Sequence, residues 1–318
     1  MPHGWIILDK PLGLGSTQAV AAVKRNLREA GYSKVKVGHG GTLDPLATGV
    51  LPIALGEATK LAGRMLDASK VYVFTVAFGA ETDTLDLEGK VVAESAARPT
   101  LTEIAAVLPR FTGPIEQVPP AYSALKVDGE RAYDRARAGE DLELKARQVT
   151  VFELKLSWFT GNAAPDFAAS RGEISRGEPE DEAMFLAHVS KGTYIRSLAR
   201  DIAHALGTVG HVTMLRRLRA GPFTLDSAIS LDKLNEVGKG AALENVLLPL
   251  EAGLVDIPAL DLGPVQARAV REGRVLTGLT FQDGVYWARL GSNPLALMEL
   301  SGGDARVLRG FNLSDVAE

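Results

Sequence analysis

Apolar residues recur at every second position in several short runs of the chain, which is the pattern of half-buried β-strands. The run over residues 71–78 is the clearest, because four large side chains then share one face of a strand: Tyr72, Phe74, Val76 and Phe78. Other short apolar runs predict strands at residues 5–8, 149–158 and 184–189.

A spacing of three to four residues between apolar positions predicts helices in three other segments. Ser16 is a good N-cap for a helix that ends at Gly31. Thr100 and Glu103 form a capping box before a second amphipathic helix. Thr193 can cap a third helix, which Gly207 ends.

The remaining segments carry turn and loop signals. Residues 38–49, GHGGTLDPLATG, predict a glycine-rich loop between a strand and a helix. Residues 161–183 contain few large apolar side chains and predict a mobile insertion. After about residue 250 the pattern changes to short β-like runs, which predict a small, separate β-rich domain.

Composition narrows the class of protein. The 318 residues suggest two domains, or one large domain with an appendage. The absence of cysteine excludes disulfides, thiol nucleophiles and thiolate metal sites. The net charge is −4, but residues 1–70 hold nine Lys and Arg against five Asp and Glu. A polyanion is therefore expected to meet the N-terminal part first. We see no signal peptide and no membrane-spanning run, and we expect a cytoplasmic protein.

Asp44 is the first candidate for chemistry. It lies among four glycines and before Pro45, which favours an extended backbone at Asp44. A carboxylate held in such a loop is well placed for catalysis. From spacing alone, an aspartate that caps the amides of a turn is the better interpretation.

Other glycine-loop chemistries are excluded. The chain contains no GxxxxGK[ST] phosphate loop, and no GxGxxG at a strand-to-helix turn. Without a C-x-x-C pair, a zinc nucleoside deaminase is excluded as well.

Three basic segments have two interpretations each. Arg196 follows the start of a predicted helix, where a cation is disfavoured, so it indicates a carboxylate or phosphate partner; the alternative is an exposed arginine. Residues 119–137 mix Arg and Lys with Tyr122 and Tyr133, which suits RNA but also a solvated, salt-bridged face. The run MLRRLRAG at 214–221 suits phosphate contacts, or a solvated helix face.

Six stretches, in this order, resemble the TruB family of tRNA pseudouridine synthases. They cover most of residues 4–223: GWIILDKPLGLGST (4–17), VGHGGTLDPLATGVLPIALGEATK (37–60), KVYVFTVAFGAETDTLDLEGKVV (70–92), PPAYSALKVDGERAYDRAR (119–137), VSKGTYIRSLARDIAHALG (189–207) and HVTMLRRLRAGPF (211–223).

The resemblance implies an α+β fold, with a catalytic domain over residues 1–245 around a mostly antiparallel mixed sheet. A thumb-like RNA-binding segment at about 121–148 and a small, β-rich PUA-like domain over 250–318 complete it. The implied reaction is isomerisation of the T-loop uridine (position 55) of tRNA to pseudouridine. The resemblance also implies that the reaction uses no metal or organic cofactor. We expect the T-arm of tRNA as the partner, with no guide RNA or protein partner.

The resemblance also implies roles for residues in catalysis. Asp44 matches the catalytic aspartate, and Arg196 matches the arginine that pairs with this carboxylate. Tyr72 matches the tyrosine that stacks on the flipped base and takes up the C5 proton. The flipped base needs an aromatic platform, and an ionised carboxylate can attack or remove a proton. Whether Asp44 attacks the base, attacks the sugar or removes the C2′ proton stays open.

Further residues are expected to bind RNA. His39 matches the histidine that helps to displace the target nucleotide, Lys10 and Pro11 match a motif beneath the loop, and Tyr194 fits a second active-site tyrosine. Basic side chains complete the expected RNA contacts: Lys126, Arg131, Arg216, Arg217 and Arg219.

Three other functions compete with tRNA pseudouridine synthesis as interpretations of the sequence. The first is a non-catalytic RNA-binding or RNA-folding protein on the same scaffold, against which the presence of Asp44, Tyr72 and Arg196 counts. An RNA methyltransferase would need a cofactor loop or a cysteine nucleophile that the sequence lacks. An RNA-guided synthase in a multiprotein particle is distinguished by activity on bare tRNA.

Overall fold

A computed structural model describes residues 1–32, 34–123, 125–127, 130–138, 140, 144–157 and 178–313. The chain divides into two compact units. The first comprises Met1–Asp44, Val50–Leu66 and Gly221–Glu318, and the second comprises Pro45–Gly49 and Asp67–Ala220. Most of the predicted insertion at 161–183 lies outside the described residues.

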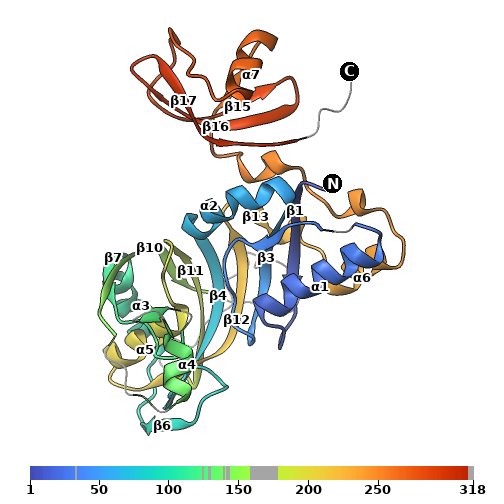
Figure 1. Ribbon diagram of the computed structural model, residues 1–318. Helices are drawn as coiled ribbons and strands as arrows, with labels where there is room; N and C mark the ends of the chain where they lie inside the picture. The colour runs from blue at the N-terminus through green and yellow to red at the C-terminus, as the bar shows by residue number, and fades with distance from the viewer. Residues whose placement is uncertain are drawn as a thin grey trace. The chain divides into compact units, whose positions relative to one another are not determined.

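Five antiparallel strands form the sheet of the second unit (Figure 1). Their order is β12 (Gly210–Ala220), β4 (Lys70–Phe78), β11 (Glu182–Val189), β10 (Arg147–Leu156) and β7 (Gly113–Gln117). The first residues of β3 (Ala47–Leu55) pair in parallel with β12, so that Ala47 lies opposite Leu215. The expected α+β fold around a mostly antiparallel mixed sheet is therefore confirmed.

Two helices cover one face of this sheet, α3 (Leu101–Val107) and α5 (Ile195–Ala205) (Figure 1). Their apolar side chains share one core with Phe74, Val76 and Phe78 of β4, and Tyr72 packs against the same core. The shared face predicted from strand alternation is confirmed. The capping box also forms, because Thr100 Oγ1 accepts from the Glu103 N–H and Glu103 accepts from the Thr100 N–H.

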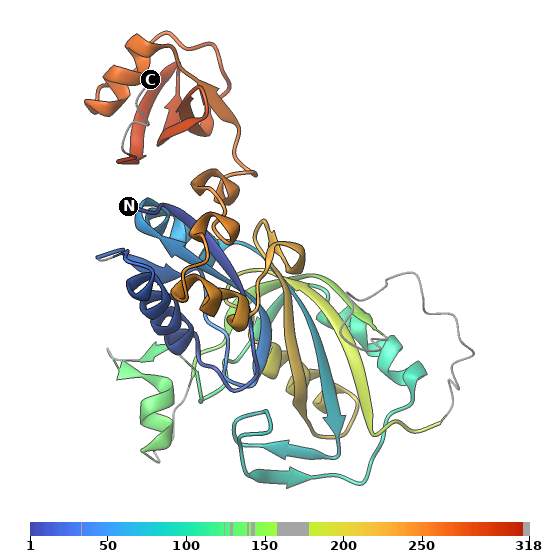
Figure 2. The ribbon, with the colours of Figure 1, turned by 90° about the vertical axis from the view of Figure 1, so that its right-hand side faces the viewer.

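Smaller elements complete the second unit. Figure 2 shows β5 (Ala80–Thr82) and β6 (Val91–Glu94) as a hairpin where the chain leaves β4. The segment before β10 holds β8 (Lys126–Val127), β9 (Glu130–Arg131) and α4 (Ala132–Arg137).

In the first unit, β1 (Gly4–Lys10) leads to α1 (Ser16–Glu29), and β2 (Val37–His39) pairs with β3. Asn26 of α1 bonds to Asn235 of α6 (Leu231–Gly238) at 3.1 Å. Two further short elements of this unit are α2 (Ala62–Asp67) and β13 (Phe223–Thr224). The predicted cap at Ser16 is wrong: Gly15 holds the N-cap position and its N–H donates to Gln18, because the Ser16 hydroxyl is engaged elsewhere.

The end of the chain has its own four-stranded sheet and core. Its strands follow the order β14 (Ala259–Asp261), β15 (Gly284–Leu290), β16 (Asn293–Ser301) and β17 (Asp304–Gly310), and α7 (Pro264–Arg271) packs on them. The expected β-rich C-terminal part is confirmed, and a boundary between residues 245 and 250 stays a prediction.

The expected cap at Thr193 is wrong, because its hydroxyl donates to the Ser190 carbonyl and Tyr194 holds the N-cap position of α5. The alternative of a solvated helix face at 214–221 is also excluded, since residues 214–220 belong to strand β12 and their backbones pair with β4. Among the described residues, no helix is both long enough and apolar enough to cross a membrane.

Candidate functional site

Asp44 lies in the connection between two strands, β2 and β3, and not between a strand and a helix as predicted. Gly38 and His39 pair with Ala54 and Ile53, so the first residues of the glycine-rich segment are strand. A side chain at Gly40 would meet the Met65 Cβ at 2.5 Å, which only glycine avoids. The His39 Nδ1 accepts from the Gly41 N–H at 3.4 Å.

Ser16 holds the backbone of the residue before Asp44. Its hydroxyl donates to the Leu43 carbonyl at 2.9 Å and accepts from the Leu43 N–H at 2.7 Å. Ser16 is 6% exposed and Leu43 is buried, so these bonds form away from water. Local sequence does not indicate this role of Ser16, since a serine before a helix usually signals a cap.

Lys10 is completely buried at the end of β1. Its Nζ donates to the carbonyls of Pro11 and Leu14, at 3.0 and 2.7 Å. A buried ammonium of this kind needs such acceptors. In this structure Lys10 therefore orders the turn that leads into α1.

Tyr72 lies near the start of β4, opposite Ala187 of β11 and Arg217 of β12. Two residues earlier, burial and, to a lesser extent, the positive charge of Arg217 lower the pKa of Lys70 to about 8. The Lys70 Nζ donates to the Ala68 carbonyl at 2.6 Å. The start of β4 thus carries the half-buried phenol of Tyr72 two residues after Lys70, whose charged form is destabilised by burial.

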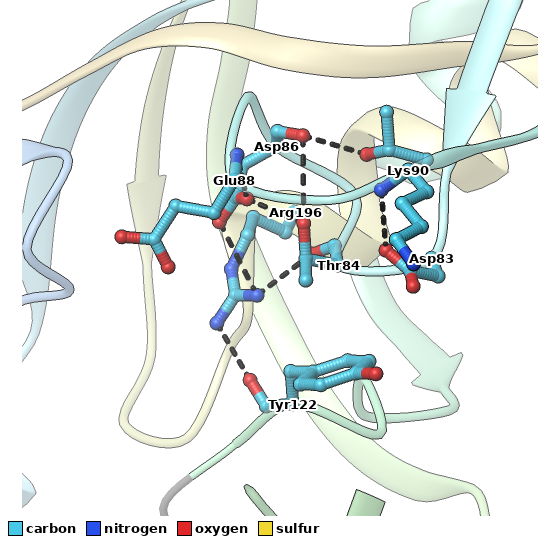
Figure 3. A network of polar contacts seen from close by, with 8 residues as sticks. Asp83, Thr84, Asp86, Glu88, Lys90, Tyr122 and Arg196 are labelled. Carbon is cyan, nitrogen blue, oxygen red and sulfur yellow. Dashed lines mark hydrogen bonds and ion pairs between the residues drawn. The ribbon is translucent and has the colours of Figure 1, made fainter. Parts of the chain in front are cut away.

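Arg196 is the centre of a buried polar network in the second unit (Figure 3). Its guanidinium donates to the Thr84 carbonyl at 2.7 Å and to the Tyr122 carbonyl at 2.9 Å. It also forms an ion pair with Asp86 at 3.5 Å. The side chain is 6% exposed, so the alternative of an exposed arginine is excluded, and a carboxylate that was not predicted, that of Asp86, lies beside it.

The turn that holds Asp86 is itself built from side-chain hydrogen bonds (Figure 3). The Asp86 carboxylate accepts from the Thr84 hydroxyl at 2.6 Å and from the Glu88 N–H at 3.0 Å. Leu85 has a φ of 63°, which a leucine rarely adopts. None of these residues was predicted as a site residue, although TDTLDLEG at 82–89 concentrates turn-forming side chains.

Tyr194 is fixed at the start of α5. Its N–H donates to Gln117 Oε1 at 2.8 Å, and its carbonyl accepts from Gln117 Nε2 at 3.1 Å. The Arg147 guanidinium lies 4.7 Å from the centre of the Tyr194 ring, and it also donates to the Gly192 carbonyl. One cation therefore orders both the ring and the turn before it.

The three arginines of β12 differ in exposure. Arg217 is 1% exposed, whereas Arg216 and Arg219 are half-buried. Arg216 donates to the Thr48 hydroxyl at 3.3 Å, and Arg219 lies 3.1 Å from His188 Nε2. The charge of Arg219 helps burial to lower the pKa of His188. A role in phosphate binding therefore suits Arg216 and Arg219 better than Arg217.

The expected thumb-like segment packs its aromatic residues together. The Tyr122 and Tyr133 rings lie 6.0 Å apart, edge to face, and Arg137 lies 4.7 Å from the centre of the Tyr133 ring. Lys126 and Arg131 pair through their backbones. Because Tyr122 also accepts from Arg196, this segment and the Arg196 network are directly connected.

The expected site residues are divided between the units. Lys10, His39 and Asp44 belong to the first unit. The second unit holds Tyr72, Lys126, Arg131, Tyr194, Arg196, Arg216, Arg217 and Arg219. The expected pairing of Arg196 with Asp44, and the roles of all these residues, stay predictions.

The chain is similar to known proteins over its whole length. Residues 27–195 match the model of the TruB family pseudouridylate synthase N-terminal domain, and residues 196–255 match that of the tRNA pseudouridylate synthase B C-terminal domain. A Novosphingobium aromaticivorans protein named tRNA pseudouridine synthase B is 70% identical over 318 residues, which is all of both chains. A Zymomonas mobilis protein of the same name is 57% identical over 98% of this chain and 96% of its own.

Two solved structures share the fold. One is described as an H/ACA RNP bound to a substrate RNA containing 2′-deoxyuridine, with a TM-score of 0.70 and 25% identity over 98% of this chain and 86% of that one. The other is a Cbf5-Nop10-Gar1 complex, with a TM-score of 0.70 and 26% identity over 97% and 84%. Because the two family models together match residues 27–255 and one relative is 70% identical over the full length of both chains, the chain belongs to the TruB family of pseudouridylate synthases.

Proposed function

We propose that this protein isomerises the uridine at position 55 in the T-loop of tRNA to pseudouridine. The observation that carries the proposal is the 70% identity, over the full length of both chains, to a protein named tRNA pseudouridine synthase B. Asp44, Tyr72 and Arg196 are present at the positions that the family resemblance assigns to the reaction.

The reaction needs three things from the protein. The target base must leave the stack, because the N1–C1′ bond cannot be exchanged for a C5–C1′ bond inside it. A carboxylate must then act on the base or the ribose, which is the proposed role of Asp44. Finally C5 must lose its proton and N1 must take one up, so that substrate and product have the same atoms, and the Tyr72 phenol oxygen is the proposed acceptor of the C5 proton.

The other residues support these steps in the proposal. Tyr72 projects from a strand whose neighbouring side chains form the core, which suits a rigid stacking surface for the base. Arg196 is held by two carbonyls and by Asp86, so a carboxylate paired with it would have a fixed direction. His39 is proposed to occupy the space of the displaced nucleotide, and Tyr194 to line the site.

Binding of the T-arm is assigned to basic side chains of the second unit. Arg216 and Arg219 are proposed to contact phosphates, while Lys126 and Arg131 act from the thumb-like segment. We propose that bare tRNA suffices, without guide RNA or a protein partner. The likeness to chains from an RNP and from a three-component complex makes this point worth a separate test.

The test is to map pseudouridine in a tRNA transcript treated with the purified protein alone. The expected product is pseudouridine at position 55 and nowhere else in a transcript that carries uridine there. A transcript with cytidine at position 55 is the matched control. A protein that binds this tRNA without forming pseudouridine would instead be the RNA-binding or RNA-folding protein, and activity that requires an added RNA would indicate a guided synthase.

A further inference from the structure

The two hydrogen bonds of Ser16 have a consequence for the residue that follows Leu43. The Leu43 carbonyl belongs to the same planar peptide unit as the Asp44 N–H. A hydroxyl that fixes this carbonyl, at 2.9 Å, therefore fixes the plane of the peptide and the direction in which it leads to the Asp44 Cα. The second bond, from the Leu43 N–H at 2.7 Å, fixes the preceding peptide as well.

Pro45 restricts Asp44 from the other side. The proline ring favours an extended backbone at the residue before it. The backbone at Asp44 is thus limited by Ser16 through Leu43 and by Pro45 directly. From this fixed backbone, the two side-chain torsions of Asp44 determine where the carboxylate lies.

Ser16 is itself carried by a rigid element. It is the first residue of α1, and this helix buries Ala19, Val23 and Leu27 in the core. Groups held on packed helices are positioned more accurately than groups on loops. The neighbouring Thr17 is exposed, so within this turn the hydroxyl that contacts Leu43 is that of Ser16.

We propose that Ser16 is a positioning residue for Asp44: its hydroxyl sets the direction of the Leu43–Asp44 peptide and thereby the aim of the carboxylate. This inference rests on the proposed catalytic role of Asp44. Misplacement of a reacting group by about 1 Å can cost about 100-fold in rate. Loss of the hydroxyl is therefore expected to slow the chemical step without weakening tRNA binding.

The experiment is a single-turnover measurement with enzyme in saturating excess over tRNA that carries tritium at C5 of uridine. Under this condition the rate constant does not depend on the fraction of enzyme that is folded, so a purely structural role would leave it unchanged. Ser16→Ala is expected to release tritium about 10- to 100-fold more slowly than the wild type, with the dissociation constant for tRNA unchanged. Thr17→Ala, which removes an exposed hydroxyl from the same turn, is expected to match the wild type.

Two further variants complete the test. Ser16→Thr keeps the hydroxyl and is expected to restore at least half of the wild-type rate constant. Ser16→Cys keeps about the same side-chain volume but has a weaker hydrogen-bond donor, so its rate constant is expected to lie between those of the wild type and the alanine variant. This variant replaces Ser16→Ala in the test if the alanine variant does not fold. The inference is overturned if Ser16→Ala turns over at the rate of Thr17→Ala, or if Ser16→Ala loses only tRNA affinity. Where Ser16→Ala does not fold, the same two outcomes for Ser16→Cys overturn it. It is also overturned if Ser16→Thr is as slow as the alanine variant. If the wild type itself forms no pseudouridine, the proposed function fails instead.

Discussion

The Asp86 carboxylate lies 3.5 Å from the Arg196 guanidinium, and both side chains are buried. Removing one partner of a buried ion pair leaves the other charge uncompensated, at a cost of about 3–5 kcal/mol. We expect Asp86→Asn to lower the free energy of unfolding by an amount in this range, and to slow pseudouridine formation as well. Urea denaturation and single-turnover kinetics measure the two effects.

Asp83→Asn is the matched control for Asp86. The Asp83 carboxylate lies in the same turn and accepts from the Lys90 N–H at 2.9 Å, a bond that an amide oxygen can keep. Equal effects of the two substitutions would show that Asp86 acts by stabilising the turn and not through its ion pair with Arg196.

Asp44→Asn is expected to abolish turnover while tRNA binding survives. The amide is nearly isosteric with the carboxylate but can neither attack nor accept the proton. Pseudouridine mapping and a binding titration measure the two properties. Asp232→Asn, at an exposed position of α6, is the control. Turnover of Asp44→Asn near the control would remove Asp44 from the mechanism.

Substitutions of Tyr72 separate two proposed roles of its side chain, stacking on the base and uptake of the C5 proton. Tyr72→Phe keeps the ring and removes the hydroxyl, whereas Tyr72→Leu removes both. If the hydroxyl takes up the C5 proton, the phenylalanine variant binds normally and releases tritium about 100- to 10,000-fold more slowly. We expect this result, with the leucine variant losing affinity as well. A phenylalanine variant that releases tritium at the wild-type rate would leave stacking as the role of Tyr72.

Arg216 and Arg219 are expected to contact phosphates. Replacing either by alanine should weaken the binding of all tRNAs similarly and reduce the slope of log affinity against log salt by about 1. Arg217→Ala is expected mainly to lower stability, because Arg217 is buried. Salt titrations of the three variants give the answer, and two unchanged slopes for Arg216 and Arg219 would exclude both as phosphate ligands.

Lys70 makes stability depend on pH in the alkaline range. Its pKa is about 8 in the folded chain, against an ordinary value of 10.5. Between these values the unfolded chain binds the proton and the folded chain does not, so folding becomes more favourable as pH rises from about 8 to 10.5.

Lys70→Met removes this group. We expect the free energy of unfolding of the wild type, relative to that of Lys70→Met, to rise by up to about 3 kcal/mol across this range. Urea denaturation at both ends of the range measures it. A difference that stays constant with pH would show that Lys70 has its ordinary pKa in the folded chain.

Local pattern was enough to predict most of the elements. The alternation from Tyr72 to Phe78 predicted both the strand and its core face, because burial on a sheet follows a period of two. The cap at Thr100 was predicted because both of its bonds lie within four residues. The run 214–221 was open to a helical interpretation because its arginines and leucines fit either period, and pairing with β4 decided it.

The site was less accessible to sequence reasoning. Local pattern drew attention to Asp44 and Arg196, and the resemblance supplied Tyr72 and the roles of all three, but the partners of Arg196 lie 74 to 112 residues away along the chain. No local spacing links Arg196 to Thr84 or Tyr122, since only the folded sheet and α5 bring these groups together. Ser16 was misinterpreted for the same reason, because its partner Leu43 is 27 residues distant.

The parallel pairing of β3 with β12 constrains how the chain reaches its native state. It joins residues 47–49 to residues 215–217, so the beginning of β3 has no partner on this side until about two thirds of the 318 residues have been synthesised. Contacts between such distant residues are slow to form, because a long loop must close first. The strand that directly follows the Asp44 segment therefore completes its pairing late, and during synthesis on the ribosome its open edge is exposed to aggregation for longer than the local helices and hairpins.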